Sequence, residues 1–359
     1  MNPITVVILS FSLLGALDCV LGNRLGIGKE FQRAFSIFAP MALSMLGMIV
    51  IAPALGAWLQ PVFDGFYSLT GIDPSIIPAS LFANDMGGMN LAQSICKTED
   101  IGNYNAFVIS SMMGCVISFT LPFSLGLVKQ DQHKELFFGI LCGIVTIPIG
   151  SLVAGLICKI NILALLLNLL PLIIISVIIG VALIFARKVC IKCFTAFGFF
   201  MKVLSIVGLA CSIFTFLTKI EISPHFDSFE NAAFICANAC VTLSGALPFM
   251  FIVTKLLNRP LTKMGSLIGV NSVSTISLLG SLVTNASTFG VMDRMDKKGV
   301  VLNSAFAVSA SFVFGSHLAF TMAFNEDYIL PMTVGKLISG ICALVLASVI
   351  YKDGERQSA

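Results

Sequence analysis

Asp85 stands in the middle of an apolar stretch, residues 76–95, with Asn84 before it and Gly87 and Gly88 shortly after it. A short carboxylate cannot reach the membrane surface from such a position, and an ionisable group there is typical of a substrate or ion pathway. The glycines let other groups approach the backbone closely. We therefore predict that these four residues bind a small cation. The alternative for Asp85 is a helix cap or a buried hydrogen bond.

Amide and hydroxyl side chains are scattered through a second interrupted apolar stretch, residues 268–292, and through the apolar stretch that follows it, residues 300–323. Serines in membrane helices commonly serve helix packing, which is the alternative for each hydroxyl taken singly. Together with Asp85 they would form a pocket with one negative charge and several neutral hydrogen-bonding partners, which suits a small cation that carries a hydroxyl group. The residues that we add to the predicted site are Asn271, Thr284, Asn285, Ser309 and Ser311.

Three further ionisable side chains lie in apolar stretches. Lys202 and Lys336 each stand about two turns from a predicted helix end, and their long stems can carry the ammonium to the interface. We expect a structural role for both, including pairing with a carboxylate. His317 stands near the outer end of its helix and could titrate near neutral pH, so we include it in the predicted site; the alternative is a structural histidine.

Composition places the chain in a membrane. Hydrophobic residues make up 57% of the 359 residues and charged residues 11%, and the mean hydropathy is +0.99. Apolar runs of about 20 residues, the length that spans a bilayer as a helix, recur with short polar gaps. The sequence therefore predicts an all-α polytopic integral membrane protein. A net charge of +3 gives no basis for nucleic-acid binding, and we expect no cofactor and no metal.

The polar interruptions divide the predicted segments into two kinds. Backbone that leaves the helix at bilayer depth must be buried in protein or line a wet cavity, so we predict broken or re-entrant segments at 76–95 and 268–292. We predict nine continuous membrane helices at 3–21, 37–59, 104–128, 136–158, 161–185, 194–218, 232–254, 300–323 and 329–351.

The distribution of Lys and Arg favours this arrangement. With two re-entrant segments, 16 of the 21 Lys and Arg residues fall in loops on one side and 3 on the other. Cytoplasmic loops carry the excess of positive charge in membrane proteins. The predicted N-terminus is therefore outside, and the predicted C-terminus is in the cytoplasm.

An internal repeat follows the same boundaries. Gly71-Ile72-Asp73 is echoed by Gly269-Val270-Asn271, and Asp85 then falls opposite Asn285. An odd number of crossings would invert the second half relative to the first, as in many secondary transporters. The predicted parts are a first half at 1–160, a linking helix and basic loop at 161–193, a second half at 194–351 and a short cytoplasmic tail at 352–359.

Several strings in a fixed order resemble the EutH family of ethanolamine utilisation transporters, which are bacterial inner-membrane proteins. The resemblance covers nearly the whole chain and implies uptake of ethanolamine across the cytoplasmic membrane for its breakdown. Ethanolamine is largely a cation at neutral pH, which matches the carboxylate of Asp85. The strings are Leu81–Gly88, Ser110–Gly114, Gly143–Gly150, Phe289–Gly299, Phe306–Phe320 and Pro331–Gly340.

The chain departs from that family pattern within the predicted site. Asn84 stands where we expect cysteine, Thr284 stands before Asn285 where we expect a second asparagine, and Ser316 precedes His317 where we expect a carboxylate. His317 therefore lacks the acidic neighbour that would make a local acid–histidine pair. Asp85 is left as the main candidate for contacting the substrate.

We expect facilitated uptake of the ammonium form by a protein that is not an enzyme. The sequence contains no His-Glu-x-x-His, Gly-x-Ser-x-Gly or Walker motif. The alternatives are a channel or a membrane sensor for a small amine, because re-entrant segments also build selectivity filters. A transporter of a related amine coupled to protons or sodium is a further alternative. The lipid bilayer is an expected partner, and the sequence leaves open whether the chain forms a homo-oligomer.

Overall fold

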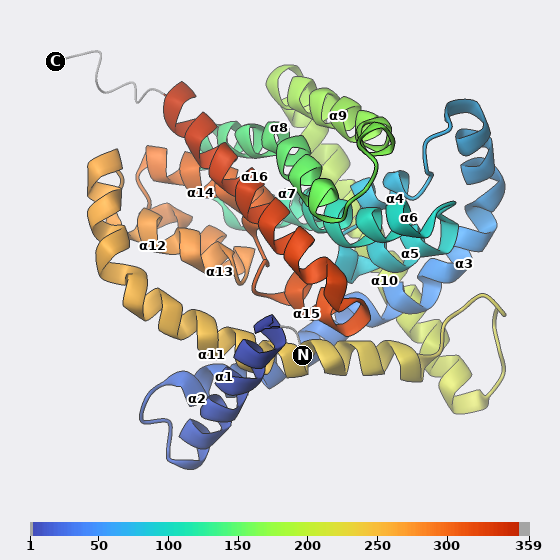
Figure 1. Cartoon of the computed structure of the whole chain (residues 1–359), viewed down its shortest axis with the longest axis horizontal. Helices are drawn as coiled ribbons and strands as arrows, with labels where there is room; N and C mark the ends of the chain where they lie inside the picture. Colours follow the sequence, from blue (N-terminus) through green and yellow to red (C-terminus); the bar gives the residue numbers. More distant parts are fainter. Residues whose placement is uncertain (1–2, 352–359) are drawn as a thin grey trace.

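The computed structural model describes residues 3–351, with side chains at every position except 44, 187, 258, 259, 261 and 264–268. All regular structure in this part of the chain is helical (Figure 1). Among the described residues, eight helical stretches are long and apolar enough to cross a membrane, so the chain is an all-α polytopic membrane protein. The long single helices are α1 (Pro3–Val20), α3 (Phe38–Thr70), α8 (His133–Ile157), α9 (Ile162–Phe185), α10 (Arg187–Thr218), α11 (Phe229–Ile268) and α16 (Ile329–Ile350).

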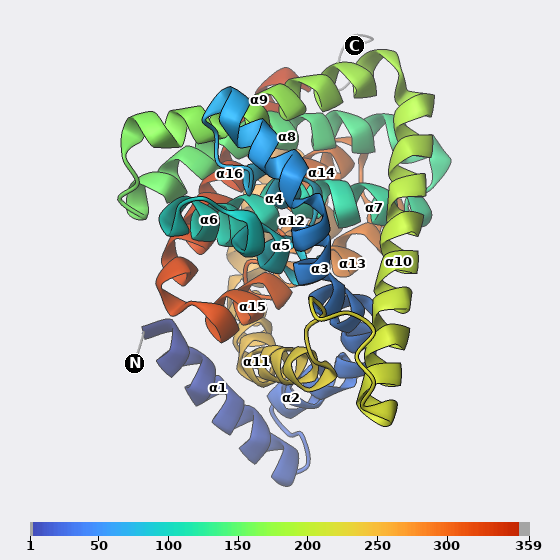
Figure 2. The same cartoon turned by 90° about the vertical axis from the view of Figure 1, so that its right-hand side faces the viewer.

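Helices α1, α9 and α10 lie at the periphery. Figure 2 shows α10 along one side of the molecule, α9 across one end and α1 at the far lower corner. Apolar side chains such as Leu163, Ile178 and Phe199 are exposed on the outer surfaces of α9 and α10. An apolar surface of this extent requires lipid around it, in agreement with a membrane position.

The first predicted break, within 76–95, is present. Its parts are α4 (Ile76–Leu81), the single turn η1 (Asn84–Met86) and α5 (Gly88–Ile95). Gly87, between η1 and α5, has a φ of 86°, which residues with a Cβ rarely adopt. The N–H of Ala83 donates to the Ser118 hydroxyl at 3.0 Å, so backbone freed by the break is paired inside the protein.

The second predicted break, within 268–292, is also present. Its parts are α12 (Ser272–Ser281), α13 (Asn285–Phe289) and the turn η5 (Met292–Arg294). Both helices begin at a capping side chain, as the polar residue types indicate. The side-chain oxygen of Asn271 accepts the N–H of Ser274 at 2.8 Å, and Thr284 accepts that of Ala286 at 3.3 Å.

The continuous helix predicted over 300–323 is interrupted. Its parts are α14 (Lys297–Ala310) and α15 (Ser316–Phe324), and the turn η6 (Glu326–Tyr328) follows. Phe312 adopts a φ of 61°. Its N–H donates to the carbonyl of Ser281 at 3.0 Å, and the N–H of Phe314 donates to that of Leu282 at 2.8 Å. The second break therefore supplies the acceptors that stabilise this third break.

The helix predicted over 104–128 is wider than an α-helix along much of its length. Its parts are α6 (Glu99–Tyr104), the π-helical η2 (Asn105–Gly114) and η3 (Val116–Thr120), and α7 (Leu121–Leu127), with the turn η4 (Gln130–Gln132) after it. We call residues 105–120 the π-helical segment. Such i→i+5 geometry occurs mostly as short bulges at functional sites. Gly114 presses against the first break, where a Cβ would collide with the carbonyl of Phe82.

Helices α8 and α16 pack side by side in the centre of the molecule (Figure 1). Gly150 lies against Gly335, and Thr146 Oγ1 lies 3.5 Å from Ser339 Oγ. Because residue numbers rise along one helix and fall along the other, the pair is antiparallel. Small residues allow this close approach of two membrane helices.

Matching local features stand at the beginning of the two predicted broken segments. The carboxylate of Asp73 accepts the N–H and the hydroxyl of Ser75, as the side-chain oxygen of Asn271 accepts those of Ser274. Gly71, two residues before Asp73, and Gly269, two residues before Asn271, both have a positive φ. These features agree with the predicted repeat, and the division into inverted halves stays a prediction.

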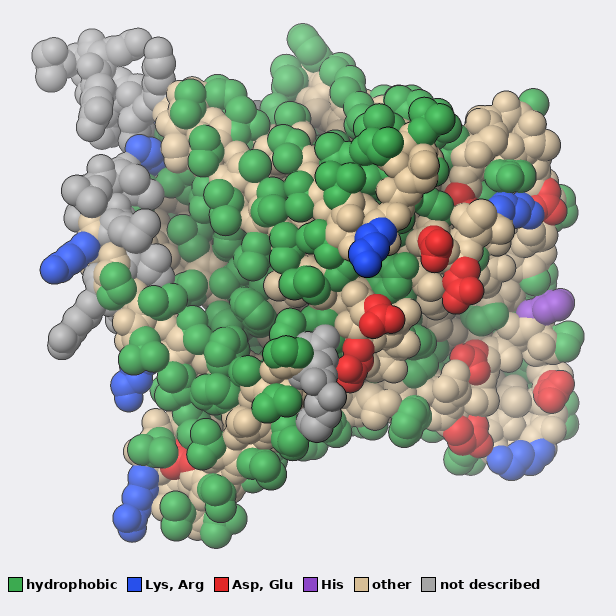
Figure 3. Space-filling view, viewed as in Figure 1, with side chains coloured by type: hydrophobic (Ala, Val, Ile, Leu, Met, Phe, Trp, Pro, Cys, Tyr) green, Lys and Arg blue, Asp and Glu red, His purple; other side chains and the backbone are tan. Residues whose placement is uncertain are grey.

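The charged side chains separate along the molecule. Figure 3, viewed as Figure 1, shows most of its Lys and Arg side chains at the left edge and most of its Asp and Glu side chains in the right half. Helices α12 and α13 lie towards the left, and α4 and α5 lie towards the right (Figure 1). The two predicted broken segments thus lie towards opposite ends, as a pair of re-entrant segments entering from opposite sides would.

Several predicted loops are helical. The predicted loop at 186–193 belongs largely to α10, which begins at Arg187, and α11 continues to Ile268 where the prediction ended a helix at 254. Lys and Arg are good helix formers, so a polar stretch can extend a membrane helix beyond its apolar part. The short helix α2 (Ile27–Ser36) lies in the predicted loop between the helices at 3–21 and 37–59. The predicted tail at 352–359 lies outside the described residues.

Candidate functional site

A cavity of about 420 Å³ connects Arg33 on α2 with Asp85 on η1. Helices α3 and α11, the π-helical segment and the second and third breaks form its wall. The Arg33 side chain is 53% exposed, whereas the Asp85 side chain is 11% exposed. The cavity therefore leads from the surface of the protein to a buried carboxylate.

The Asp85 carboxylate faces the first turn of α15. Ser316 lines the same cavity as Asp85, and the Asp85 Oδ1 lies 3.9 Å from His317 Nε2. The free N–H groups at a helix N-terminus carry partial positive charge, which stabilises an anion at this position. A separation of 3.9 Å is too long for a hydrogen bond, so the carboxylate keeps free acceptor positions for a ligand.

His317 lies between Asp85 and a buried ammonium group. Lys336 Nζ lies 3.1 Å from His317 Nδ1, and it also donates to the carbonyl of Ser111. An ammonium can only donate, so Nδ1 accepts and the ring proton sits on Nε2, which faces Asp85. His317 is 1% exposed and Lys336 is fully buried. The three side chains form a row of carboxylate, imidazole and ammonium.

Asn84, Gly87 and Gly88 shape the loop that carries Asp85 without lining the cavity. Asn84 Oδ1 accepts the N–H of Asp85 at 2.9 Å, and its buried Nδ2 has no hydrogen-bond partner within the described residues. A Cβ at Gly88 would collide with the carbonyl of Phe82. These residues fix the position of the carboxylate.

Thr284 and Asn285 lie at the second break in different environments. Thr284 lines the cavity, whereas Asn285 is fully buried behind it. Asn285 Nδ2 donates to the hydroxyl of Thr120 at 3.0 Å. Its Oδ1 is buried and finds no hydrogen-bond partner in the described part of the chain.

The remaining predicted residues do not line the cavity. Ser309 and Ser311 are fully buried beside the third break, and Ser311 contacts the thiol of Cys115, which does line the cavity. Asn271 lies at the start of α12, where its N–H donates to Asp296 Oδ1 at 2.9 Å. The structure therefore brings Asp85, Thr284 and His317 to the cavity, places the other predicted residues of the breaks behind its wall, and leaves Asn271 outside.

The site predicted from the sequence leaves out three residues that the structure brings to it. Phe312 lines the cavity, and its ring centroid lies 5.0 Å from that of His317. Ser316 also lines the cavity, and Lys336 contacts His317. The available signal for Lys336 was its place inside an apolar helix, but a long stem equally allows the ammonium to reach the interface.

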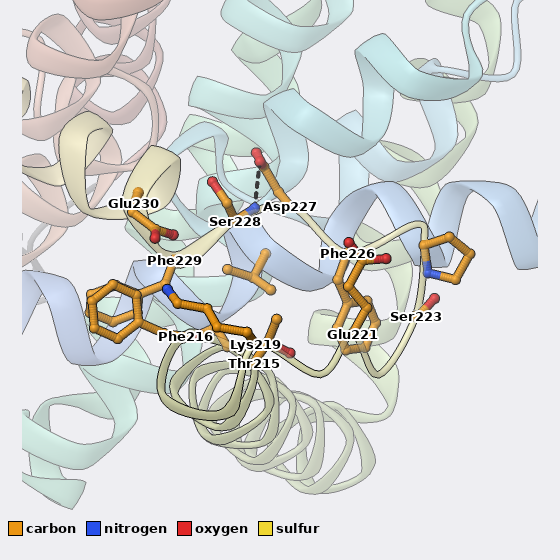
Figure 4. A pocket seen from close by; sticks show the side chains of 13 residues that line it. Thr215, Phe216, Lys219, Glu221, Ser223, Phe226, Asp227, Ser228, Phe229 and Glu230 are labelled. Carbon is orange, nitrogen blue, oxygen red and sulfur yellow. Dashed lines mark hydrogen bonds between the residues drawn. The ribbon is translucent and has the colours of Figure 1, made fainter.

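A second hollow of about 250 Å³ lies where α10 passes into α11 (Figure 4). Lys219, Glu221 and Glu230 stand around it, and the Ser228 N–H donates to Asp227 Oδ1 at 2.7 Å. None of the predicted site residues lines this hollow. Among the described side chains, no group of three His, Cys, Asp or Glu is placed to hold a metal ion. We therefore take the cavity at Asp85 as the candidate site.

Comparison with known proteins points to one family. A family model described as "Ethanolamine utilisation protein, EutH" matches residues 1–350. A "Probable ethanolamine permease EutH" of Listeria monocytogenes serotype 1/2a (strain 10403S) is 38% identical over 336 residues, which cover 94% of this chain and 90% of that protein. A protein of the same name from Salmonella typhimurium is 32% identical, with 99% of this chain and 96% of that protein covered.

A further relative bears a different name. The "Uncharacterized protein YxeR" of Bacillus subtilis is 34% identical over 347 residues, which cover 97% of this chain and 94% of that protein. No solved structure matches the chain.

Proposed function

Because the chain belongs to the EutH family of ethanolamine utilisation proteins, we propose that it is a facilitated transporter of ethanolamine in its ammonium form. Relatives that are similar along nearly the whole chain are named ethanolamine permeases, which supports the cargo. The observation that carries the proposal is the buried carboxylate of Asp85 at the inner end of a cavity that reaches the surface. The membrane would be the bacterial cytoplasmic membrane, from which ethanolamine enters the cell.

The ammonium group of the substrate would bind the Asp85 carboxylate. A cation needs a compensating charge to leave water, and hydrogen bonds to an ionised acceptor are the strongest that the cavity offers. The substrate hydroxyl would bind Thr284, whose side chain also lines the cavity. The face of the Phe312 ring could add a cation–π contact beside the ammonium.

The position of the cavity supports an inward-facing state. Arg33 stands on α2, in the predicted loop that the distribution of Lys and Arg assigns to the cytoplasm. Thr284 belongs to the break predicted to enter from that side. Inverted halves at 1–160 and 194–351, joined by 161–193, would exchange this state for an outward-facing one. The first break would then move against α15, and the second against the π-helical segment.

Uptake of labelled ethanolamine into proteoliposomes tests the function. At mildly acidic pH the passive leak of neutral amine is small, so liposomes without protein give the background. We expect saturable uptake that an imposed sodium gradient does not accelerate and that unlabelled ethanolamine inhibits.

Two results would contradict the proposal. Uptake equal to that of empty liposomes, with the purified protein still binding ethanolamine, would indicate a sensor. Flux that does not saturate with concentration would indicate a channel.

A further inference from the structure

Lys336 is an internal cation of the transport site. Its side chain is fully buried, and its Nζ is held by His317 Nδ1 and the carbonyl of Ser111. The ammonium therefore stays inside the protein, although its position along the helix had allowed the long stem to carry it to the interface. Lys202, in contrast, is exposed on α10. A charge at such depth is costly and marks a function in transport proteins.

The titratable groups around Lys336 give the empty site a balanced charge. Asp85 on η1 supplies one negative charge and Lys336 one positive charge, while His317 on α15 is neutral because it accepts from Lys336. The thiol of Cys115 on the π-helical segment also lies within electrostatic reach of Lys336. Arg33 stands at the exposed mouth of the cavity.

A bound ammonium would upset this balance. Ethanolammonium at Asp85 would leave two cations and one anion in a buried site, and uncompensated charge in a low-dielectric interior is strongly unfavourable. One proton must leave for the site to be neutral again. Lys336 is the group in the row that carries a removable proton and becomes neutral without losing its tertiary contacts.

We propose that Lys336 makes transport electroneutral, because it releases one proton when ethanolammonium binds Asp85 and takes up one when ethanolammonium leaves. This inference rests on the proposed function and deepens it. Lys336 itself does not line the cavity, whereas His317 does. His317 is therefore the contact through which the proton passes, with Nδ1 accepting it from Lys336 and Nε2 releasing its own proton towards the cavity.

The cycle balances in atoms and charge. In the outward-facing state, ethanolammonium binds Asp85, and the Lys336 ammonium becomes an amine as it releases one proton to the outer solution. In the inward-facing state, ethanolammonium leaves, and the amine takes one proton from the cytoplasm. One ethanolammonium moves in and one proton moves out, which equals downhill passage of the neutral base. Transport therefore stays facilitated, and no net charge crosses the membrane.

Currents and uptake measured on the same proteoliposomes test this proposal. For the wild type we expect saturable uptake without a transport current on a solid-supported membrane. An imposed potential should leave its initial uptake rate within about twofold, because no charge moves. The lumen should become more alkaline by one proton per ethanolammonium taken up, after subtraction of liposomes that carry an inactive Asp85→Asn protein.

A Lys336→Met variant should transport the charged substrate alone. Its uptake should be accompanied by a current of one charge per ethanolammonium. It should also accumulate substrate about tenfold under an inside-negative potential of about 59 mV, the conversion for one charge. Lys192→Met is the matched control, because it removes an exposed lysine of α10 that does not line the cavity, and it should behave as the wild type does.

The wild-type measurement alone decides the proposal if Lys336→Met does not fold. A wild-type current of one charge per ethanolammonium, or uptake that follows the potential, would overturn electroneutral exchange while leaving the proposed function intact. An electroneutral Lys336→Met protein that transports would also overturn it. Absence of uptake by the wild type would instead contradict the proposed function.

Discussion

Asn285 donates a hydrogen bond to the hydroxyl of Thr120 at 3.0 Å, which ties the second broken segment to the end of the π-helical segment. On the other side of the site, Asp85 of the first broken segment faces His317 in the first turn of α15, after the third break. Each broken segment thus contacts the helix that follows the other one. Because Asp85 and Asn285 occupy matching positions in the predicted repeat, one relative movement of the two halves would change both contacts.

The tie between Asn285 and Thr120 should contribute to stability. Thr120→Val keeps the shape of the side chain but removes the acceptor, and it leaves a buried amide donor unpaired. The expected cost is about 1–3 kcal/mol. A lower melting temperature of the purified protein in detergent would show it, with Thr195→Val at an exposed position of α10 as the control. A Thr120→Val protein as stable as the wild type would mean that the hydrogen bond does not form.

Gly315→Ala should separate the second and third breaks. A Cβ at Gly315 would collide with the carbonyl of Val283, and overpacking of this kind costs about 1–3 kcal/mol. We expect a lower melting temperature together with loss of uptake. Gly65→Ala on α3 is the matched control, since a Cβ there meets no atom within 4 Å. Equal behaviour of the two variants would contradict the close packing at Gly315.

The mouth of the cavity should be accessible from the cytoplasm. In a cysteine-free background, Arg33→Cys should react with a membrane-impermeant maleimide in inverted membrane vesicles and not in intact cells. Lys219→Cys, at the exposed end of α10, should show the opposite pattern. Reaction of Arg33→Cys from outside the cell would contradict the inward-facing assignment and the predicted topology.

The sequence revealed the first and second breaks because glycine, asparagine and threonine interrupt apolar runs there. The third break could not be predicted, because Phe312, Val313 and Phe314 read as helix and the acceptors that stabilise them are carbonyls of a distant segment. Local residue types thus predicted the first two breaks, whereas the third depends on hydrogen bonds to a segment that is distant in the sequence.

The same limit applies to the site. Asp85 was predicted to belong to the site because a carboxylate inside an apolar segment is costly and therefore typical of a functional position. The structure places it at the cavity. The position of Asn271 in the sequence could not show that its side chain caps α12 and lies away from that cavity. The place of Lys336 in the site could not be predicted, because its distance from a helix end does not show that its Nζ contacts His317.

The most direct test of the account compares uptake of labelled ethanolamine by wild-type and Asp85→Asn proteoliposomes at mildly acidic pH. Asparagine keeps the shape of the side chain and removes the charge. Losing one partner of a buried charge pair costs about 2–5 kcal/mol. We therefore expect uptake to fall at least about tenfold, since each 1.4 kcal/mol is about a factor of ten, with Asp85→Glu keeping part of it. An Asp85→Asn protein that elutes as a folded species and transports at the wild-type rate would contradict the central claim.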